Sequence, residues 1–326
     1  MSLRVRHPAS FALLLLSLLT ACSDGAGGSS ASKPQLVVGF SQVAAQANWD
    51  MANAASIRKA ARDAGIDLLL EDARRSQVNQ VATLRNFVSQ RVDVIAFSPV
   101  VESGWEAVLR EIRSAGIPVI LLDRAIEITD ESLYVSLIGS DFVEEGRRAA
   151  RWLLDNTVDV PGEINIVELQ GSVGSAPAND RKEGFAEVIT SDRRFRIIRS
   201  QSANFDRARA KEVMAEFLRV ESRRIRVLFT HSDTMALGAI EAIEAAGLKP
   251  GTDILVISIE GKREALEAIV AGKMNATVEC SPLLGPPLMA MVKEIAAGKS
   301  VPRRVITQES MFTRENAERE LPKRAY

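Results

Sequence analysis

An acid and a base follow an apolar run in the first half of the chain. Asp123 and Arg124 come directly after Ile117–Leu122, which contains no charged residue. Such a run predicts a strand buried on both faces. In open parallel sheets, ligands bind beyond the carboxyl ends of the strands, so both side chains could face a ligand. A carboxylate accepts hydrogen bonds and a guanidinium donates several in one plane, which suits a polyhydroxylated ligand. The alternative is that Asp123 caps the next turn and Arg124 pairs with it at the surface.

A second polar group follows the first predicted strand of the chain. Gln46, Asn48 and Asp50 surround Trp49. Sugars have apolar C–H faces as well as hydroxyl groups, so a flat ring beside amides and a carboxylate favours a sugar site. The alternative is that Asn48 caps the following helix and Trp49 closes the core.

A glycine-rich turn and an early helical cation follow another predicted strand. Gly171–Ser175 lacks the glycine and lysine spacing of nucleotide-binding loops, and we interpret it as a plain turn. Arg181 lies early in the next helix, where a cation opposes the helix dipole. It therefore needs another partner, and a bound ligand is one candidate.

Two more predicted strands end in polar residues. One ends at His231-Ser232-Asp233, but three consecutive side chains diverge and no G-x-S-x-G pattern is present, so we exclude a Ser-His-Asp hydrolase. The next strand ends at Glu260, whose side chain either faces a ligand bound beyond the strand ends or is a solvated loop acid.

A regular alternation of strands and helices separates these groups. Predicted strands begin roughly every 25 to 30 residues, the length of a βα unit. They are Leu36–Phe40, Asp67–Glu71, Val94–Phe97, the strand ending at Asp123, Leu133–Ile138, Ile164–Leu169, Arg196–Arg199, Val227–Thr230, Ile254–Ile259 and Ala276–Glu279. Two such series predict an α/β protein of two doubly wound parallel-sheet lobes, with ligands in the cleft between them.

The N-terminus has the features of an export signal. Arg4 and Arg6 precede the short apolar run Phe11–Leu19, which is too short to span a bilayer as a stable helix. The sequence Leu19–Cys22 resembles the bacterial lipobox, in which the cysteine is acylated. We therefore expect a signal peptide over 1–21, a lipidated Gly/Ser-rich tether over 22–34, and a membrane-tethered protein in the periplasm or at the cell surface. The alternative is an ordinary cleavable signal.

Composition limits the classes of partner and cofactor. The chain has 326 residues, 46% of them apolar, and a net charge of -1, so two domains are expected and no nucleic-acid partner. If Cys22 is lipidated, Cys280 is the single remaining thiol and no intrachain disulfide can form. With two histidines and one thiol, we predict no metal site and no cofactor.

Several motifs together resemble those of the periplasmic sugar-binding proteins of ABC importers, of the ribose and galactofuranose type. They are Val38–Val43, Pro99–Val101 with Gly104–Glu106, Leu121–Arg124, Val167–Gly171, Asp180–Glu187 and Ile198–Ser202. The galactofuranose-binding type is the most similar, and the resemblance covers about Gln35–Tyr326. It implies two lobes joined by three hinge crossings, with residues 35–139 and 282–308 in one lobe and 140–281 and 309–326 in the other.

The resemblance also implies roles for site residues. Asp123, Arg124 and Arg181 would hold sugar hydroxyl groups, and Trp49 would contact the ring. The full expected ligand-binding set is Gln46, Asn48, Trp49, Asp50, Asp123, Arg124, Arg181, Ser232 and Glu260, with Cys22 as the lipidation site.

Three positions depart from the family pattern. Asp50 stands where an arginine is usual, Ser232 where an asparagine is usual, and Glu260 where an aspartate is usual. Exchanging a cation for an anion at position 50 disfavours acidic ligands. The ligand could then be a neutral sugar other than galactofuranose, or an amino or polyol ligand.

The expected function is that of a binding protein and not an enzyme. It would capture a monosaccharide, galactofuranose-like or another neutral sugar, as a monomer that delivers it to an ABC permease. The alternative is an extracytoplasmic sensor that presents a sugar or polyol to a chemoreceptor or histidine kinase. A transcriptional regulator needs a helix-turn-helix where this chain has its signal peptide. No nucleophile–base pair or dinucleotide fingerprint supports an enzyme.

Overall fold

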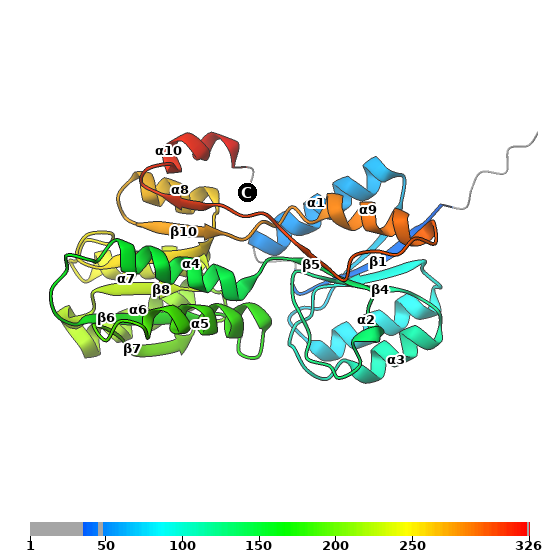
Figure 1. The fold of residues 1–326 in the computed structure, drawn as a ribbon, viewed down its shortest axis with the longest axis horizontal. Coiled ribbons are helices and arrows are strands. Elements are labelled where there is room, and N and C mark those ends of the chain that lie inside the picture. Colours follow the sequence, from blue (N-terminus) through cyan, green and yellow to red (C-terminus); the bar gives the residue numbers. More distant parts are fainter. Residues whose placement is uncertain (1–34, 45–47, 325) are drawn as a thin grey trace, which may run out of the picture. The chain divides into compact units, whose positions relative to one another are not determined.

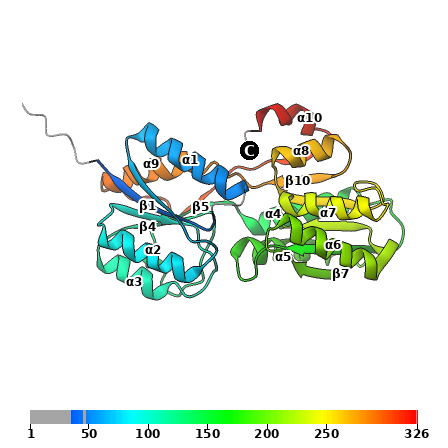
Figure 2. The same cartoon turned by 180° about the vertical axis from the view of Figure 1, so that it is seen from behind.

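Two six-stranded sheets form the framework of the molecule, which is seen here in a computed structural model that describes residues 35–44, 48–324 and 326 (Figure 1, Figure 2). The predictions for Cys22, the signal peptide, the tether and Gln46 lie outside the described residues. The first sheet contains β1 Val37–Gln42, β2 Asp67–Asp72, β3 Val94–Phe97, β4 Val119–Leu122, β5 Ser136–Gly139 and β11 Arg304–Ile306. The second contains β6 Ile164–Gln170, β7 Phe195–Ser202, β8 Val227–Thr230, β9 Leu255–Glu260, β10 Ala276–Glu279 and β12 Met311–Thr313.

The strand orders confirm the predicted doubly wound fold. They are β11-β5-β4-β3-β1-β2 and β12-β10-β9-β8-β6-β7. Within the described residues, the pairing of β10 with β12 is the one antiparallel pair of strands. In each sheet the order reverses beside the first strand of the series, β1 or β6, and the carboxyl ends of the strands near this point are where ligands bind in such sheets. We call each sheet with its helices a lobe.

Helices cover both faces of both sheets (Figure 1). In the first lobe, α1 Asn48–Ala64 and α9 Gly285–Ala296 lie on one face, and α2 Gln77–Ser89 and α3 Glu106–Ser114 on the other. In the second lobe, α4 Phe142–Asp155 and α5 Ala176–Ile189 lie on one face, with α6 Arg207–Glu221, α7 Asp233–Ala245 and α8 Arg263–Val270 on the other. The short α10 Ala317–Glu320 packs on α8. No helix among the described residues is long and apolar enough to cross a bilayer.

Local sequence explains the bounds of these elements. Every residue of β3, β4 and β5 is buried, as expected for strands covered on both faces. The Asp206 carboxylate caps the start of α6, because it accepts a 2.7 Å hydrogen bond from the Arg209 amide. Gly65 and Gly247, both with positive φ, stand just after the ends of α1 and α7.

The prediction of one strand over Leu133–Ile138 is wrong at its start. Residues Glu131–Leu133 form a 3-10 turn, and the strand is Ser136–Gly139. The Asp130 carboxylate accepts a 3.1 Å hydrogen bond from the Ser132 amide, which holds the turn in place of an extended chain.

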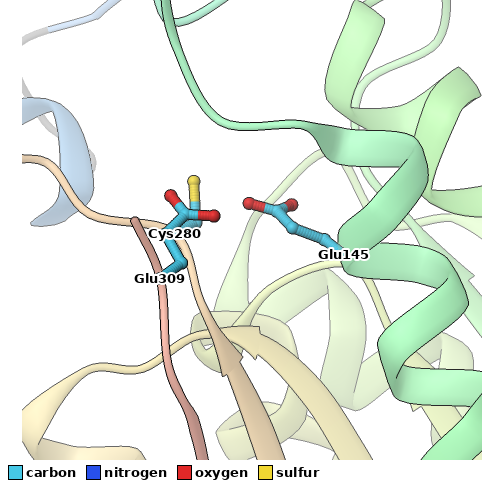
Figure 3. Close-up of side chains that lie close together, drawn as sticks. All are labelled: Glu145, Cys280 and Glu309. Carbon is cyan, nitrogen blue, oxygen red and sulfur yellow. The ribbon is translucent and has the colours of Figure 1, made fainter. Parts of the chain in front are cut away.

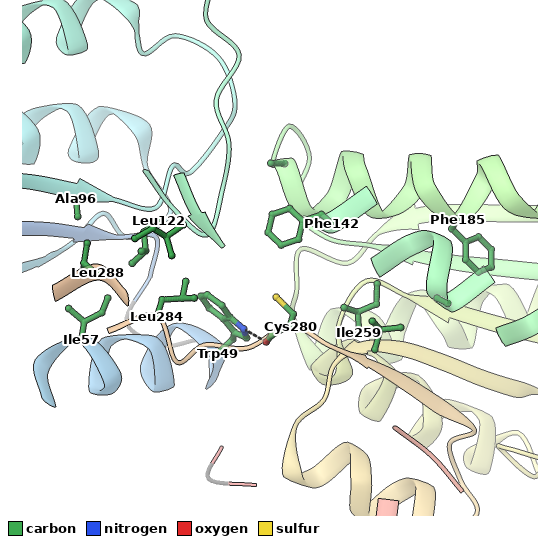
Figure 4. Packing of buried hydrophobic residues seen from close by; sticks show 14 of the residues in the cluster. Trp49, Ile57, Ala96, Leu122, Phe142, Phe185, Ile259, Cys280, Leu284 and Leu288 are labelled. Carbon is green, nitrogen blue, oxygen red and sulfur yellow. Dashed lines mark hydrogen bonds between the residues drawn. The ribbon is translucent and has the colours of Figure 1, made fainter. Parts of the chain in front are cut away.

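The chain passes between the two sheets three times, as the resemblance implied. The crossings follow β5, β10 and β11, so that α9 and β11 join the first lobe, and β12 and α10 join the second. Figure 4 shows one apolar cluster continuing through this region, where the Trp49 indole donates a 2.8 Å hydrogen bond to the Cys280 carbonyl. The Asn53 amide similarly donates to the Pro282 carbonyl at 3.0 Å. Helix α1 is thereby fixed against the second crossing.

Candidate functional site

A pocket of about 410 Å³ lies where the carboxyl ends of strands from both sheets meet. The lining residues follow strands of the first sheet (Val43, Trp49, Asp50, Arg75, Val100, Val101, Asp123, Arg124 and Phe142) and of the second (Ser172, Val173, Pro177, Arg181, Asn204, Phe205, Glu260 and Cys280). This is the position at which doubly wound sheets bind ligands. The pocket belongs to both lobes, so a ligand in it contacts both.

The structure brings most of the predicted site residues together. Trp49, Asp50, Asp123, Arg124, Arg181 and Glu260 all line the pocket. Ser232 is not among the lining residues: it is the N-cap of α7, and its hydroxyl accepts a 3.3 Å hydrogen bond from the Met235 amide. The side chain of Asn48 and the whole of Gln46 lie outside the described residues.

Asp123 and Arg124 form a buried pair in the wall of the pocket. The Arg124 Nε lies 3.4 Å from the Asp123 Oδ2, and both residues are less than a tenth exposed. The surface pairing considered above is therefore not what forms. Burial raises the pKa of the Asp123 carboxyl, and the Arg124 guanidinium opposes that shift. Both groups keep unused hydrogen-bonding capacity toward the pocket.

Unusual backbone conformations concentrate at the pocket. Seven described non-glycine residues have clearly positive φ, and five of them line it: Arg75, Asp123, Asn204, Phe205 and Glu260. For Glu260, φ is 128°, a value that side chains strongly disfavour. Such strain persists only where surrounding structure enforces it, and it gathers at ligand sites. The backbone therefore supports a binding role independently of the side chains.

Arg181 is the most completely held cation of the pocket. Its Nε donates to Glu145 Oε2 at 2.7 Å, and its Nη1 donates to the His231 carbonyl at 2.6 Å. The guanidinium lies 5.0 Å from the centre of the Phe142 ring. The His231 ring in turn pairs with Glu168 at 3.1 Å, at the base of the second lobe. The predicted second partner of Arg181 is thus Glu145, and the rest of its guanidinium faces the pocket.

Aromatic rings supply the apolar part of the pocket wall. Trp49 and Phe142 come from α1 and α4, and Phe205 follows β7. The indole N–H of Trp49 is already taken by the Cys280 carbonyl, which fixes the plane of the ring. Flat rings beside carboxylates and guanidinium groups can pack on the C–H face of a small ring while its hydroxyl groups are hydrogen-bonded.

The lobes also contact each other at the rim of the pocket. The Arg75 Nη1 donates a 2.8 Å hydrogen bond to the Asn204 carbonyl, and the Glu102 amide donates to the Gly174 carbonyl at 3.1 Å. The Asn179 amide group donates to the Glu102 carboxylate. These contacts join loops of the first lobe to loops and the start of α5 in the second, so the pocket is seen in a closed form.

Asp50→Asn is expected to reduce the dependence of stability on pH. Burial raises the pKa of Asp50 to about 7, with Arg124 as the main opposing group. A raised pKa means that the folded state holds the proton more tightly, so this stabilisation is full at low pH and is lost as the pH rises through about 7. Between about pH 5 and pH 8, the variant should lose about 1–2 kcal/mol less unfolding free energy than wild type. Urea unfolding of the sugar-free proteins measures this, and parallel pH profiles would contradict it.

Several lining residues were not predicted. Arg75 follows the strand β2. The rule that ligands bind beyond the carboxyl ends of parallel strands could have identified it. Phe205 follows β7, which continues to Ser202, whereas the predicted strand stopped at Arg199. Cys280 was singled out only as a free thiol, although it directly follows the predicted strand Ala276–Glu279 and its position at that strand end could have placed it in the pocket wall.

Comparison with known proteins agrees with this architecture. Residues 38–300 match the periplasmic binding protein domain. The chain is 41% identical to the galactofuranose-binding protein YtfQ of Escherichia coli K12, over 94% of this chain and 97% of that protein. A Mycobacterium smegmatis structure in complex with β-D-fucofuranose is 48% identical with a TM-score of 0.86, covering 88% of this chain and 94% of that one. The binding protein of an arabinose ABC transporter from Shewanella sp. ANA-3, bound to α- and β-L-arabinofuranose, is 42% identical with a TM-score of 0.85, covering 89% and 95%.

Two sheets joined by three crossings, with a polar pocket between them, define a two-lobed binding protein. The chain belongs to the periplasmic binding protein family, within the group similar to the sugar-binding proteins of the ribose and galactofuranose type. The resemblance derived from the sequence motifs is confirmed.

Proposed function

We propose that the protein is the substrate-binding component of an ABC sugar importer and that it binds one neutral monosaccharide as a furanose. The observation that carries the proposal is the pocket itself, in which carboxylates and guanidinium groups from both lobes surround a small space bordered by aromatic rings. Solved relatives that are 48% and 42% identical hold fucofuranose and arabinofuranose, which supports the ring form.

The chemistry of the pocket fits a neutral polyol ring better than an acid. Asp50, Asp123 and Glu260 accept hydrogen bonds, whereas Arg124 and Arg181 donate them. Each sugar hydroxyl group can do both, so it can bridge such groups. A sugar carboxylate would instead be buried near three acids, with part of the positive charge already paired to protein carboxylates. We therefore expect uronic acids to be excluded.

The sugar would favour the closed form because it contacts both lobes at once. Asp123, Arg124 and Trp49 belong to the first lobe, whereas Arg181 and Glu260 belong to the second. We place the lobe boundaries at residues 35–139 with 282–308, and 140–281 with 309–326. The closed protein would then present both lobes to a membrane permease as a monomer, tethered through acylated Cys22.

Calorimetric titration of the purified protein tests this function. L-Arabinose, D-fucose and D-galactose, which all reach furanose forms in solution, should be compared with D-glucuronate and myo-inositol. We expect one of the first three sugars to bind at one site per chain, and glucuronate not to bind. Binding of glucuronate or myo-inositol in preference to all three sugars would contradict the proposal. Absence of binding by all five compounds would also contradict it.

A further inference from the structure

The three hinge crossings meet at one half-buried carboxylate, that of Glu309. Glu309 Oε1 accepts hydrogen bonds from the Ser140 hydroxyl of the first crossing, from the Ser281 amide of the second at 3.1 Å, and from the Thr307 hydroxyl of the third at 2.8 Å. The Ser140 hydroxyl also lies 3.3 Å from the Cys280 thiol. A rotation of one lobe against the other must move these segments. Closure therefore changes the positions of the groups that donate hydrogen bonds to Glu309.

Glu145 connects this hinge cluster to the sugar pocket. It lies on the first turn of α4 and is 1% exposed. Figure 3 shows its carboxylate directed toward Cys280 and Glu309, and one ligand atom from each of the three residues lies within 4.8 Å of the others. Its Oε2 holds the pocket residue Arg181, whereas its Oε1 is buried without a hydrogen-bond partner among the described residues. Buried polar atoms are normally hydrogen-bonded, so a buried carboxylate oxygen without a partner requires an explanation.

We propose that Glu145 is a positioning residue that holds Arg181 for the sugar and couples the position of that guanidinium to the hinge through Cys280 and Glu309. The proposal rests on the sugar-binding function given above. Two carboxylates this close repel each other unless a proton or a cation compensates them. Arg181 supplies that cation only when its guanidinium lies against Glu145 in the wall of the closed pocket. The bound sugar, by ordering Arg181, would thereby favour the closed arrangement of the crossings.

The charges around Glu145 agree with this role. The charged or titratable groups that act on it are Arg181 on α5 and, on the crossings, Glu309 and Cys280. Burial raises the pKa of Glu145 to about 8, Arg181 opposes the shift and Glu309 adds to it. Burial likewise raises the pKa values of Cys280 and Glu309. A bridging divalent cation is the competing explanation of this cluster, but Arg181 already provides a positive charge at 2.7 Å from Glu145.

A double-mutant cycle on sugar affinity tests the coupling. Glu145→Gln keeps an oxygen that can accept from Arg181 but removes the charge, and Glu309→Gln does the same at the hinge. We expect each variant to bind the sugar about tenfold more weakly and the double variant to be no weaker than about twentyfold, because both changes break one coupled unit. Glu144→Gln, an exposed neighbour on the same helix, is the matched control and should stay within about twofold.

Several outcomes would overturn the proposal. Unchanged affinity in Glu145→Gln would do so, and so would a double variant about a hundredfold weaker, since independent losses multiply. Wild-type titrations are run with and without a chelator, and loss of binding on its addition would assign the cluster to a metal ion instead. If wild type bound no sugar, the proposed function would fail, whereas a binding wild type with an unaffected Glu145→Gln variant would refute only the coupling.

A measurement without sugar tests the charge of Glu145 directly. Because its folded pKa of about 8 lies above its unfolded value, the stabilisation from its proton is full at low pH and is lost as the pH rises through about 8. The Tm of sugar-free wild type should fall between about pH 5 and pH 8, and that fall should be smaller in Glu145→Gln but not in Glu144→Gln. Equal slopes in wild type and Glu145→Gln would show that burial and the Glu309 carboxylate do not act on the Glu145 charge in the folded protein, and would overturn the coupling of Glu145 to the hinge.

Discussion

Replacing Arg124 with alanine is expected to weaken sugar binding by at least about a hundredfold while leaving the protein folded. A guanidinium in the pocket wall can donate two hydrogen bonds to neighbouring hydroxyl groups of a sugar. Hydrogen bonds to charged groups each contribute about 1.5–3 kcal/mol, and 1.4 kcal/mol corresponds to a factor of ten. The change also leaves Asp123 without its 3.4 Å partner beside the ligand. The apolar core is not touched, because Arg124 lines a pocket and not the interior of either lobe.

Titration calorimetry and thermal unfolding of the same preparations measure both parts of this prediction. Arg110→Ala is a suitable control, since Arg110 is half exposed on α3 and, among the described residues, forms surface ion pairs with Glu106 and Asp130. Surface pairs of this kind contribute about 0–1 kcal/mol, so the control should bind sugar normally. If the Arg124→Ala variant bound sugar with an affinity within threefold of wild type, Arg124 would not contact the sugar and this prediction would be wrong.

Gly184→Ala is expected to lower the free energy of unfolding by about 3 kcal/mol or more and to impair sugar binding. Helices α4 and α5 pack with their backbones in close approach at two glycines. A Cβ atom on Gly184 would lie 1.9 Å from the Val143 carbonyl oxygen, and one on Gly146 would lie 2.2 Å from the Arg181 carbonyl oxygen. Rigid backbone cannot yield as a side chain does, so the helices must separate. That movement displaces Arg181 from Glu145 and from the pocket.

Denaturant unfolding and sugar titration of the variant check this second prediction. Gly65→Ala is the control, because its added methyl group meets nothing within 4 Å and costs only the left-handed backbone conformation, about 1–2 kcal/mol. The control should retain sugar affinity, since Gly65 lies at the far end of α1 from the pocket. Equal stability losses in the two variants, with sugar affinity kept in both, would mean that the helix contact is looser than described.

Much of the fold and part of the site could be predicted from the sequence because both depend on local pattern. Buried strands such as β3 and β4 are apolar throughout, and glycines stand at helix ends. The βα units can therefore be recognised in the sequence. Asp123 and Arg124 directly follow β4 and Glu260 is the last residue of β9, so their positions at strand ends identified them. Ser232 follows the same rule, but a serine before a helix is also a good N-cap, and in the structure its hydroxyl has that role.

The remainder depends on long-range contacts that periodicity does not record. Strands β11 and β12 have three residues each, too short for a detectable alternation, and they form only by pairing with β5 and β10. The hinge cluster joins Glu145 to Glu309 across most of the second lobe's sequence. Glu145 itself looks like an ordinary acid in the first turn of a helix, where the helix dipole favours it. Only the folded chain shows that it is buried between a pocket arginine and the hinge.

A crystal structure of the protein grown with L-arabinose or D-fucose, whichever binds more tightly, tests the central claim most directly. The account predicts a five-membered sugar ring between the two lobes, with its hydroxyl groups within hydrogen-bonding distance of Asp123, Arg124 and Arg181 and one face of the ring against an aromatic side chain. A six-membered ring in that pocket would contradict the furanose assignment. A sugar bound elsewhere, with the pocket between the lobes holding only water, would contradict the site itself.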